Sequence, residues 1–160
     1  MKKNLPPPTI APETVKTLVR SVVEEEDRSR SFMVFGLSEE TGEGEDQLVS
    51  KVGEVLQDIG EKPRVEVIRL GTPSSTSSST RPVKVTVSSS VVVNQILAKA
   101  KQLRQSSKHS RVFISPDRSP VQRVEHRALI QALKDKRESD PSKRHYLRNG
   151  KIVSAEVKTT

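Results

Sequence analysis

Basic side chains are concentrated in one stretch of the sequence, residues 111–151. Guanidinium groups bind phosphate oxygens through two parallel hydrogen bonds and can stack on bases, whereas ammonium groups act as point charges. A stretch of this composition is typical of a surface that binds nucleic acid. Its basic residues are Arg111, Arg118, Arg123, Arg127, Lys134, Lys136, Arg137, Lys143, Arg144, Arg148 and Lys151.

The charge of the whole chain is unevenly distributed. The net charge is +8, but residues 1–97 hold 12 basic and 14 acidic side chains, and residues 98–160 hold 16 basic and 6 acidic ones. We therefore expect a polyanionic partner that meets the C-terminal part. The alternative is a basic surface that serves solubility only.

The residue types give little support for catalysis, metal binding or a disulfide scaffold. The chain has no cysteine, which excludes a disulfide scaffold, a thiolate zinc site and a cysteine nucleophile. His109, His126 and His145 lie in separate segments without metal-ligand spacing. No phosphate-binding loop, signal-peptide core or membrane-length apolar run is present. We expect no enzyme activity, no metal and no cofactor, and no association with a membrane.

The elements that would position the basic residues follow from the apolar periodicity. Residues 1–12 are rich in proline, which predicts an extended N-terminal segment, the proline-rich lead. Residues 13–30 are predicted to contain a helix over 13–27. That helix is either the end of a longer coiled coil or packs on the domain. Strands are predicted at 31–37, 65–70, 81–88 and 112–115, and helices at 45–59 and 91–105. Residues 71–80 predict a flexible serine-rich loop.

The C-terminal part, residues 117–160, predicts a long helix followed by a hairpin. Ser119 and Pro120 are start signals for a helix over 120–138. An apolar stripe is expected to pack inward while the basic stripe faces outward. Ile130 falls within the basic stripe, where it either packs under the C-terminal tail or contacts a ligand. Asn149-Gly150 between residues 143–148 and 151–157 indicates a tight hairpin turn. The apolar stripe comprises Val121, Val124, Ala128, Leu129 and Ala132, and the basic stripe Arg123, Arg127, Lys134 and Arg137.

Residues 31–116 show two strand–helix–strand units in succession. This order predicts an α+β fold of the ferredoxin-like βαββαβ type, with helices on one face of an antiparallel sheet and the other face open. We expect Met33, Lys84 and Thr86 to be exposed on the open face, and Phe35 and Phe113 to belong to the core.

The succession of four motifs resembles the first-open-reading-frame protein of LINE-type (non-LTR) retrotransposons. The motifs are RSRSFMVFGLSEE, VIRLGTPSSTSSSTRPVKVTVSSS, RVFISPDRSPVQRVEHRAL and KRHYLRNGKIV, and the resemblance covers about residues 15–157. It implies an RNA-recognition-motif-like domain between a coiled coil and a basic C-terminal domain. It further implies a protein that trimerises through a longer coiled coil, coats its own RNA and acts as a nucleic-acid chaperone in a cytoplasmic, or alternatively nuclear, ribonucleoprotein.

These lines together predict a sequence-tolerant protein that binds single-stranded RNA, with DNA as an alternative ligand. Without aromatic residues at the exposed positions of the first and third strands, phosphate contacts should dominate its affinity. Tyr146 either stacks on a base or packs within the hairpin. The competing interpretations are a protein-interaction module on the same fold and, less favoured, an acylphosphatase-like enzyme. The expected contacts are Lys84, Arg111, Arg118, Arg123, Arg127, Lys134, Arg137, Lys143, Arg144, Tyr146, Arg148 and Lys151.

Overall fold

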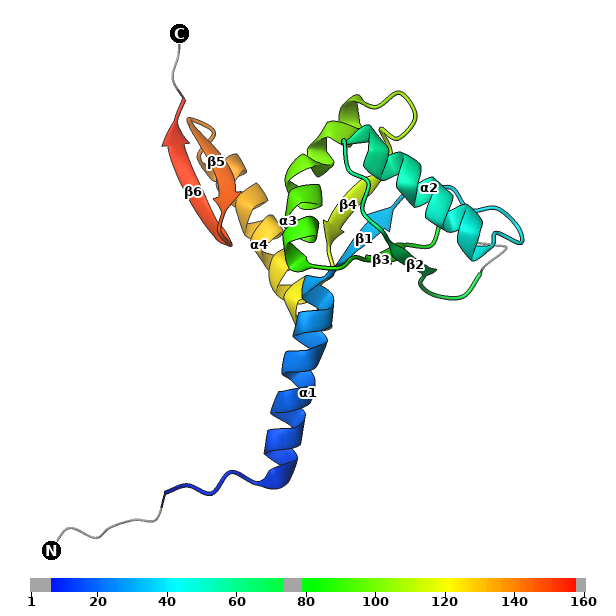
Figure 1. Ribbon diagram of the computed structural model, residues 1–160. Coiled ribbons are helices and arrows are strands. Elements are labelled where there is room, and N and C mark those ends of the chain that lie inside the picture. Colours follow the sequence, from blue (N-terminus) through cyan, green and yellow to red (C-terminus); the bar gives the residue numbers. More distant parts are fainter. Residues whose placement is uncertain (1–6, 74–78, 158–160) are drawn as a thin grey trace, which may run out of the picture. The chain divides into compact units, whose positions relative to one another are not determined.

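The computed structural model describes residues 7–73 and 79–157 (Figure 1). Predictions for the first six residues of the proline-rich lead and for 74–78 of the serine-rich loop lie outside this range. The helices and strands follow one another in the order that the sequence predicts. They are α1 Pro12–Ser29, β1 Ser31–Phe35, α2 Glu45–Asp58, β2 Glu66–Arg69, β3 Val83–Thr86, α3 Ser90–Lys99 with the short 3₁₀ helix η1 Ala100–Gln105, β4 Phe113–Pro116, α4 Pro120–Ser139, β5 Lys143–Arg148 and β6 Lys151–Glu156.

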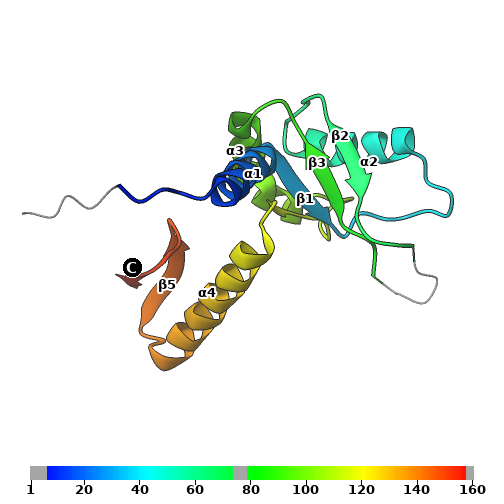
Figure 2. The same ribbon diagram turned by 90° about the horizontal axis from the view of Figure 1, so that it is seen from below.

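The chain divides into two compact units, residues 1–117 and 118–160. The first unit is an α+β structure in which four strands form an antiparallel sheet of order β2-β3-β1-β4. The second unit is α4 followed by the antiparallel hairpin β5-β6. Figures 1 and 2 both show β5 running beside α4, and the two elements are in contact.

The core of the first unit lies between the sheet and its two helices. Phe32 and Val34 of β1 and Val83 and Val85 of β3 are fully buried on this side, because alternate strand residues point to one face. The helices complete the core from the other side with apolar residues at helical spacing. These are Leu48, Val52, Val55 and Leu56 of α2, Val93 and Ile96 of α3, and Leu103 of η1.

Local signals explain most of the element ends. The Ser89 side chain accepts a hydrogen bond from the Val92 backbone N–H and caps α3. At α4, Ser119 and Gln122 form a reciprocal capping box, and Pro120 occupies the first turn. The hairpin turn contains Asn149 and Gly150 with φ of 50° and 70°, which is the left-handed conformation that these residue types favour. The predicted 91–105 helix differs in detail, because its last six residues form η1.

Helix α1 has no buried residue among those described. Its C-terminal end is tied to the sheet, since Val87 N–H donates to Arg30 O at 2.9 Å and the Ser31 hydroxyl donates to Asp27 O at 3.1 Å. The apolar stripe that the sequence predicted is nevertheless exposed, at Val15, Leu18, Val19, Val22 and Val23. Of the two alternatives for this helix, packing on the domain is therefore not observed.

No helix within residues 7–73 and 79–157 is long and apolar enough to cross a membrane.

Candidate nucleic-acid interface

The hairpin of the second unit has one inner and one outer face. His145 is buried, and its ring nitrogens lie 2.7 Å from the Ser154 hydroxyl and 2.8 Å from the Asp140 carbonyl oxygen. The buried side chain of His145 therefore identifies the inner face of β5. Because neighbouring strand residues point to opposite faces, the residues on either side of it share the outer face with Arg148. The outer face of β5 thus carries Arg144, Tyr146 and Arg148.

Strand β6 continues this outer face. Arg148 is paired with Lys151, Tyr146 with Val153, and Arg144 with Ala155. Tyr146 is half-buried, and with Arg144, Ala155, Glu156 and Val157 it lines a hollow of about 530 Å³. A partly exposed aromatic ring between two arginines is an arrangement that can stack a base and hold the phosphates on either side.

The inward face of α4 differs from the predicted one. Leu133 is buried and Leu129 and Ile130 are half-buried, whereas Val121 and Val124 are more than 60% exposed. The stripe expected to pack inward is thus largely exposed, and Ala128 and Ala132 are exposed with it. Leucine and isoleucine remove more apolar surface from water than valine and alanine do, so the face with the larger side chains is buried. This also explains the position of Ile130 within the basic stripe.

The basic side chains of α4 have two different environments. Arg123, Arg127 and Lys134 are exposed, and in the described part of the chain no carboxylate lies within 4 Å of them. Arg137 instead donates from Nε to the His145 carbonyl oxygen at 3.0 Å. Arg137 therefore holds β5 against α4 and is less free to bind a ligand than the sequence suggested.

Three further predicted contacts are less available than expected. Lys84 lies 3.1 Å from the Asp117 carboxylate, and Lys143 lies 3.9 Å from Glu156. Arg118 is half-buried, and desolvation lowers the pKa of its guanidinium. Burial, followed by the positive charge of Arg118, also lowers the pKa of His126.

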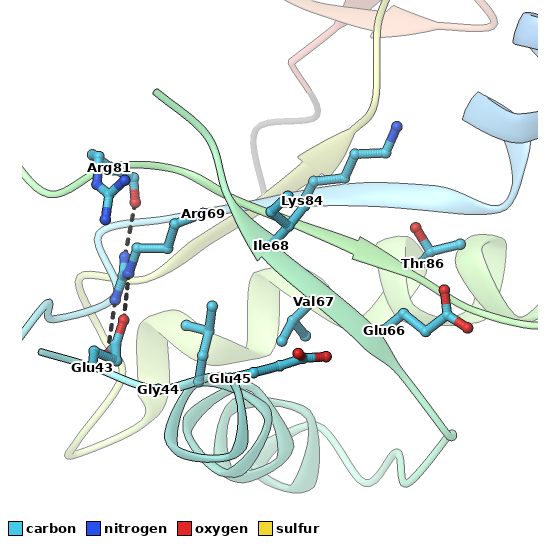
Figure 3. Close-up of a pocket in the computed structure, with 11 residues that line it drawn as sticks. Glu43, Gly44, Glu45, Glu66, Val67, Ile68, Arg69, Arg81, Lys84 and Thr86 are labelled. Carbon is cyan, nitrogen blue, oxygen red and sulfur yellow. Dashed lines mark hydrogen bonds and ion pairs between the residues drawn. The ribbon is translucent and has the colours of Figure 1, made fainter. Parts of the chain in front are cut away.

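The cations of the first unit are mostly neutralised by carboxylates. Arg69 and Glu43 are both 5% exposed, and Arg69 Nε donates to the Glu43 carboxylate at 2.6 Å. Lys51 Nζ donates to the same carboxylate at 2.6 Å, and Arg81 pairs with Glu39. Figure 3 shows the Arg69–Glu43 pair at one end of a hollow beside β2, which also exposes acidic side chains to its opening. This hollow is a poor site for a polyanion.

The second unit has the opposite balance, with 11 basic and 5 acidic residues in 118–160. Within its described residues, Arg144, Arg148 and Lys151 have no carboxylate within 4 Å. Arg111, at the end of the first unit, is exposed and likewise unpaired among the residues described. Among the described residues, unpaired cations therefore lie on the outer face of the hairpin and on α4, and the first unit adds Arg111 and, among others, Lys101 and Arg104 of η1.

The face of the sheet turned away from α2 and α3 also differs from the prediction. Met33 is only 8% exposed, although the sequence placed it on the surface. Phe35 and Phe113, expected in the core, are 41% and 56% exposed. They follow the alternation of their strands, since Phe32, Val34 and Ile114 take the core side. Alternation counted from Phe32 would have revealed Phe35, but the continuous apolar run FMVF obscures it.

No group of three or more histidine, aspartate or glutamate side chains that could hold a metal ion occurs within residues 7–73 and 79–157. His109 is buried, and its Nδ1 lies 2.6 Å from the Asp58 carboxylate, which also accepts a hydrogen bond from Ser106. The role of this histidine is to hold the chain before β4.

No model of a known protein family matches the chain, and no curated protein is significantly similar to it.

Proposed function

We propose that this protein binds single-stranded nucleic acid, RNA in the first place, without strong sequence preference. The observation that carries the proposal is the outer face of the hairpin, where Tyr146 lies between Arg144 and Arg148, and Lys151 lies across from Arg148. These cations have no competing carboxylate among the described residues. Phosphates can therefore bind them without first displacing an internal partner.

We further propose that residues 31–116 form a ferredoxin-like, RNA-recognition-motif-like domain. The sheet order β2-β3-β1-β4, the antiparallel pairing and the strand–helix order all support this assignment. With the four motifs noted above, they support a relationship to the first-open-reading-frame proteins of LINE-type retrotransposons. By that relationship the chain coats RNA in a cytoplasmic or nuclear ribonucleoprotein and acts as a chaperone rather than as an enzyme.

The test is a gel-shift or anisotropy titration with single-stranded RNA at rising salt. Each phosphate contact to a single strand contributes about 0.7 to the slope of log affinity against log salt. If six of the unpaired cations of the hairpin and α4 bind phosphates, the slope is about −4, and affinity falls roughly 300-fold between about 50 and 200 mM salt. The six residues are Arg123, Arg127, Lys134, Arg144, Arg148 and Lys151.

The position of the RNA-binding surface on the hairpin is tested by the double variant Arg144→Ala, Arg148→Ala. We expect this variant to bind all RNA sequences more weakly to the same degree. The slope of its log affinity against log salt should be flatter by about 1.4. The matched control is Lys101→Ala, Arg104→Ala, which removes the same charge from exposed positions of η1 and should change the slope less. If the parent does not bind RNA, the proposed function is wrong. If the hairpin variant binds RNA like the parent, the binding surface does not lie on the hairpin.

A further inference from the structure

Two phenylalanine rings lie next to each other on the sheet of the first unit and remain open to solvent. Phe35 of β1 and Phe113 of β4 are directly paired across the two strands, so their side chains leave the sheet on the same face. They are 41% and 56% exposed. The chain has three phenylalanines and one tyrosine in all, so half of its aromatic side chains form this one exposed pair.

The backbone beside the pair is built for a close approach of the two strands. Gly36 follows Phe35 with φ of 79°, a left-handed conformation that disfavours any residue with a Cβ. A Cβ at this position would overlap the carbonyl oxygen of Arg111, two residues before Phe113. Glycine is therefore required where the chain leaves one phenylalanine and approaches the other.

The surroundings of the pair favour a nucleic-acid base over an apolar protein segment. Along the same strands this face continues with the nearly buried Met33 on β1 and with the polar side chains Ser115 on β4 and Lys84 and Thr86 on β3. The exposed Ile68 lies at its far side, on β2. Arg111 is exposed and has no carboxylate within 4 Å in the described part of the chain. An aromatic pair on the sheet, with an exposed and unpaired arginine two residues before Phe113, matches the two parts of a nucleotide, its base and its phosphate.

We propose that Phe35 and Phe113 form a stacking platform for one or two unpaired bases of a single-stranded RNA, with Arg111 binding an adjacent phosphate. The proposal rests on the RNA-binding function proposed above and adds a second contact region, on the first unit, to the hairpin of the second. Stacking on a ring tolerates every base, so this platform adds affinity without adding sequence specificity.

The first experiment compares the parent with the double variant Phe35→Leu, Phe113→Leu, which keeps apolar side chains at both positions. Binding is measured with a single-stranded RNA and with an abasic strand of equal length and charge. We expect the variant to bind the RNA about 5- to 150-fold more weakly per stacked base. Its salt slope should be unchanged, because no phosphate contact is lost. The abasic strand should bind parent and variant equally.

The matched control is Ile68→Ala, which truncates another exposed apolar side chain, on β2. It should bind RNA like the parent. An equal loss in this control, or parent-like RNA binding by the double leucine variant, overturns the platform while leaving the proposed function intact. A parent that binds no RNA at all overturns both.

A second experiment does not depend on how well the leucine variant folds. The chain contains no tryptophan, so Phe113→Trp places a single indole at the platform. We expect its fluorescence to be quenched when RNA is added and to remain unchanged with the abasic strand. Equal quenching by both strands, or none with RNA that binds, overturns the proposal.

Discussion

The buried ion pair between Glu43 and Arg69 should be one of the most sensitive points of the first unit. The Glu43 carboxylate accepts three hydrogen bonds, from Arg69 Nε at 2.6 Å, from Arg69 Nη2 at 3.3 Å and from Lys51 at 2.6 Å. Glu43→Gln keeps the shape and removes the charge, which leaves a 5% exposed guanidinium without its counterion. Removing one partner of a buried pair costs about 3–5 kcal/mol.

We expect Glu43→Gln to lower the free energy of unfolding by about 3 kcal/mol, near the lower end of this range. The loss is limited because Arg69 retains other hydrogen-bond acceptors. It also donates to the backbone carbonyl oxygens of Leu37, Ser38 and Arg81. A loss of about 3 kcal/mol is a large share of the total stability of a small domain. In a unit of this size it corresponds to a melting temperature lowered by roughly 10–15 °C.

The assay is urea unfolding followed by circular dichroism, with Glu40→Gln as the matched control. Glu40 also pairs with Lys51, at 3.0 Å, but its side chain is 66% exposed. An exposed pair contributes about 0–1 kcal/mol, so the control should unfold almost like the parent. The reasoning is refuted if the Glu43 variant loses less than about 1 kcal/mol or if both variants lose the same amount.

Three other outcomes can be tested in the same way. Hydrogen bonds from Arg69, then Lys51, hold the pKa of Glu43 below its ordinary value of 4.5. The stability from this pair is therefore complete above pH 4.5 and is lost as pH falls through the lower folded-state pKa, so Glu43→Gln should show a flatter stability profile in acid. Gly36→Ala should cost about 1–3 kcal/mol for its positive φ, with the overlap at Arg111 in addition, measured by the same unfolding. Leu18→Glu on α1 should change stability by no more than about 0.5 kcal/mol, because Leu18 is exposed. The apolar stripe of α1 covers only about two heptads, too few to hold a coiled coil, so sedimentation should show no stable trimer of the parent.

Most elements were predictable from the sequence because their signals are local. Ser89 and Ser119 mark helix starts, Asn149-Gly150 marks the hairpin, and the alternation Val83, Val85 marks a strand with one buried face. Each depends on residues a few positions apart, which act in the same way in any tertiary context. The concentration of basic residues in the C-terminal part was visible for the same reason.

The sequence could not determine which of two plausible faces of an element becomes buried. In β1, apolar residues occupy both faces, and only pairing with β3 and β4 directs Phe32 and Val34 inward and Phe35 outward. In α4 apolar residues occur on both sides of the helix, and packing against the hairpin buries Leu133 while leaving Val121 exposed.

The sequence also shows the charge of each basic side chain. It does not show whether that side chain is free to bind a ligand. Arg137 is bonded to a backbone carbonyl of β5, and Lys84 is neutralised by Asp117, whereas Arg144 and Arg148 have no such partner among the described residues. The sequence by itself therefore determined the elements and the charge of the C-terminal part. Only the tertiary structure decided which rings and cations face solvent, because burial and ion pairing depend on residues that lie far apart in the chain.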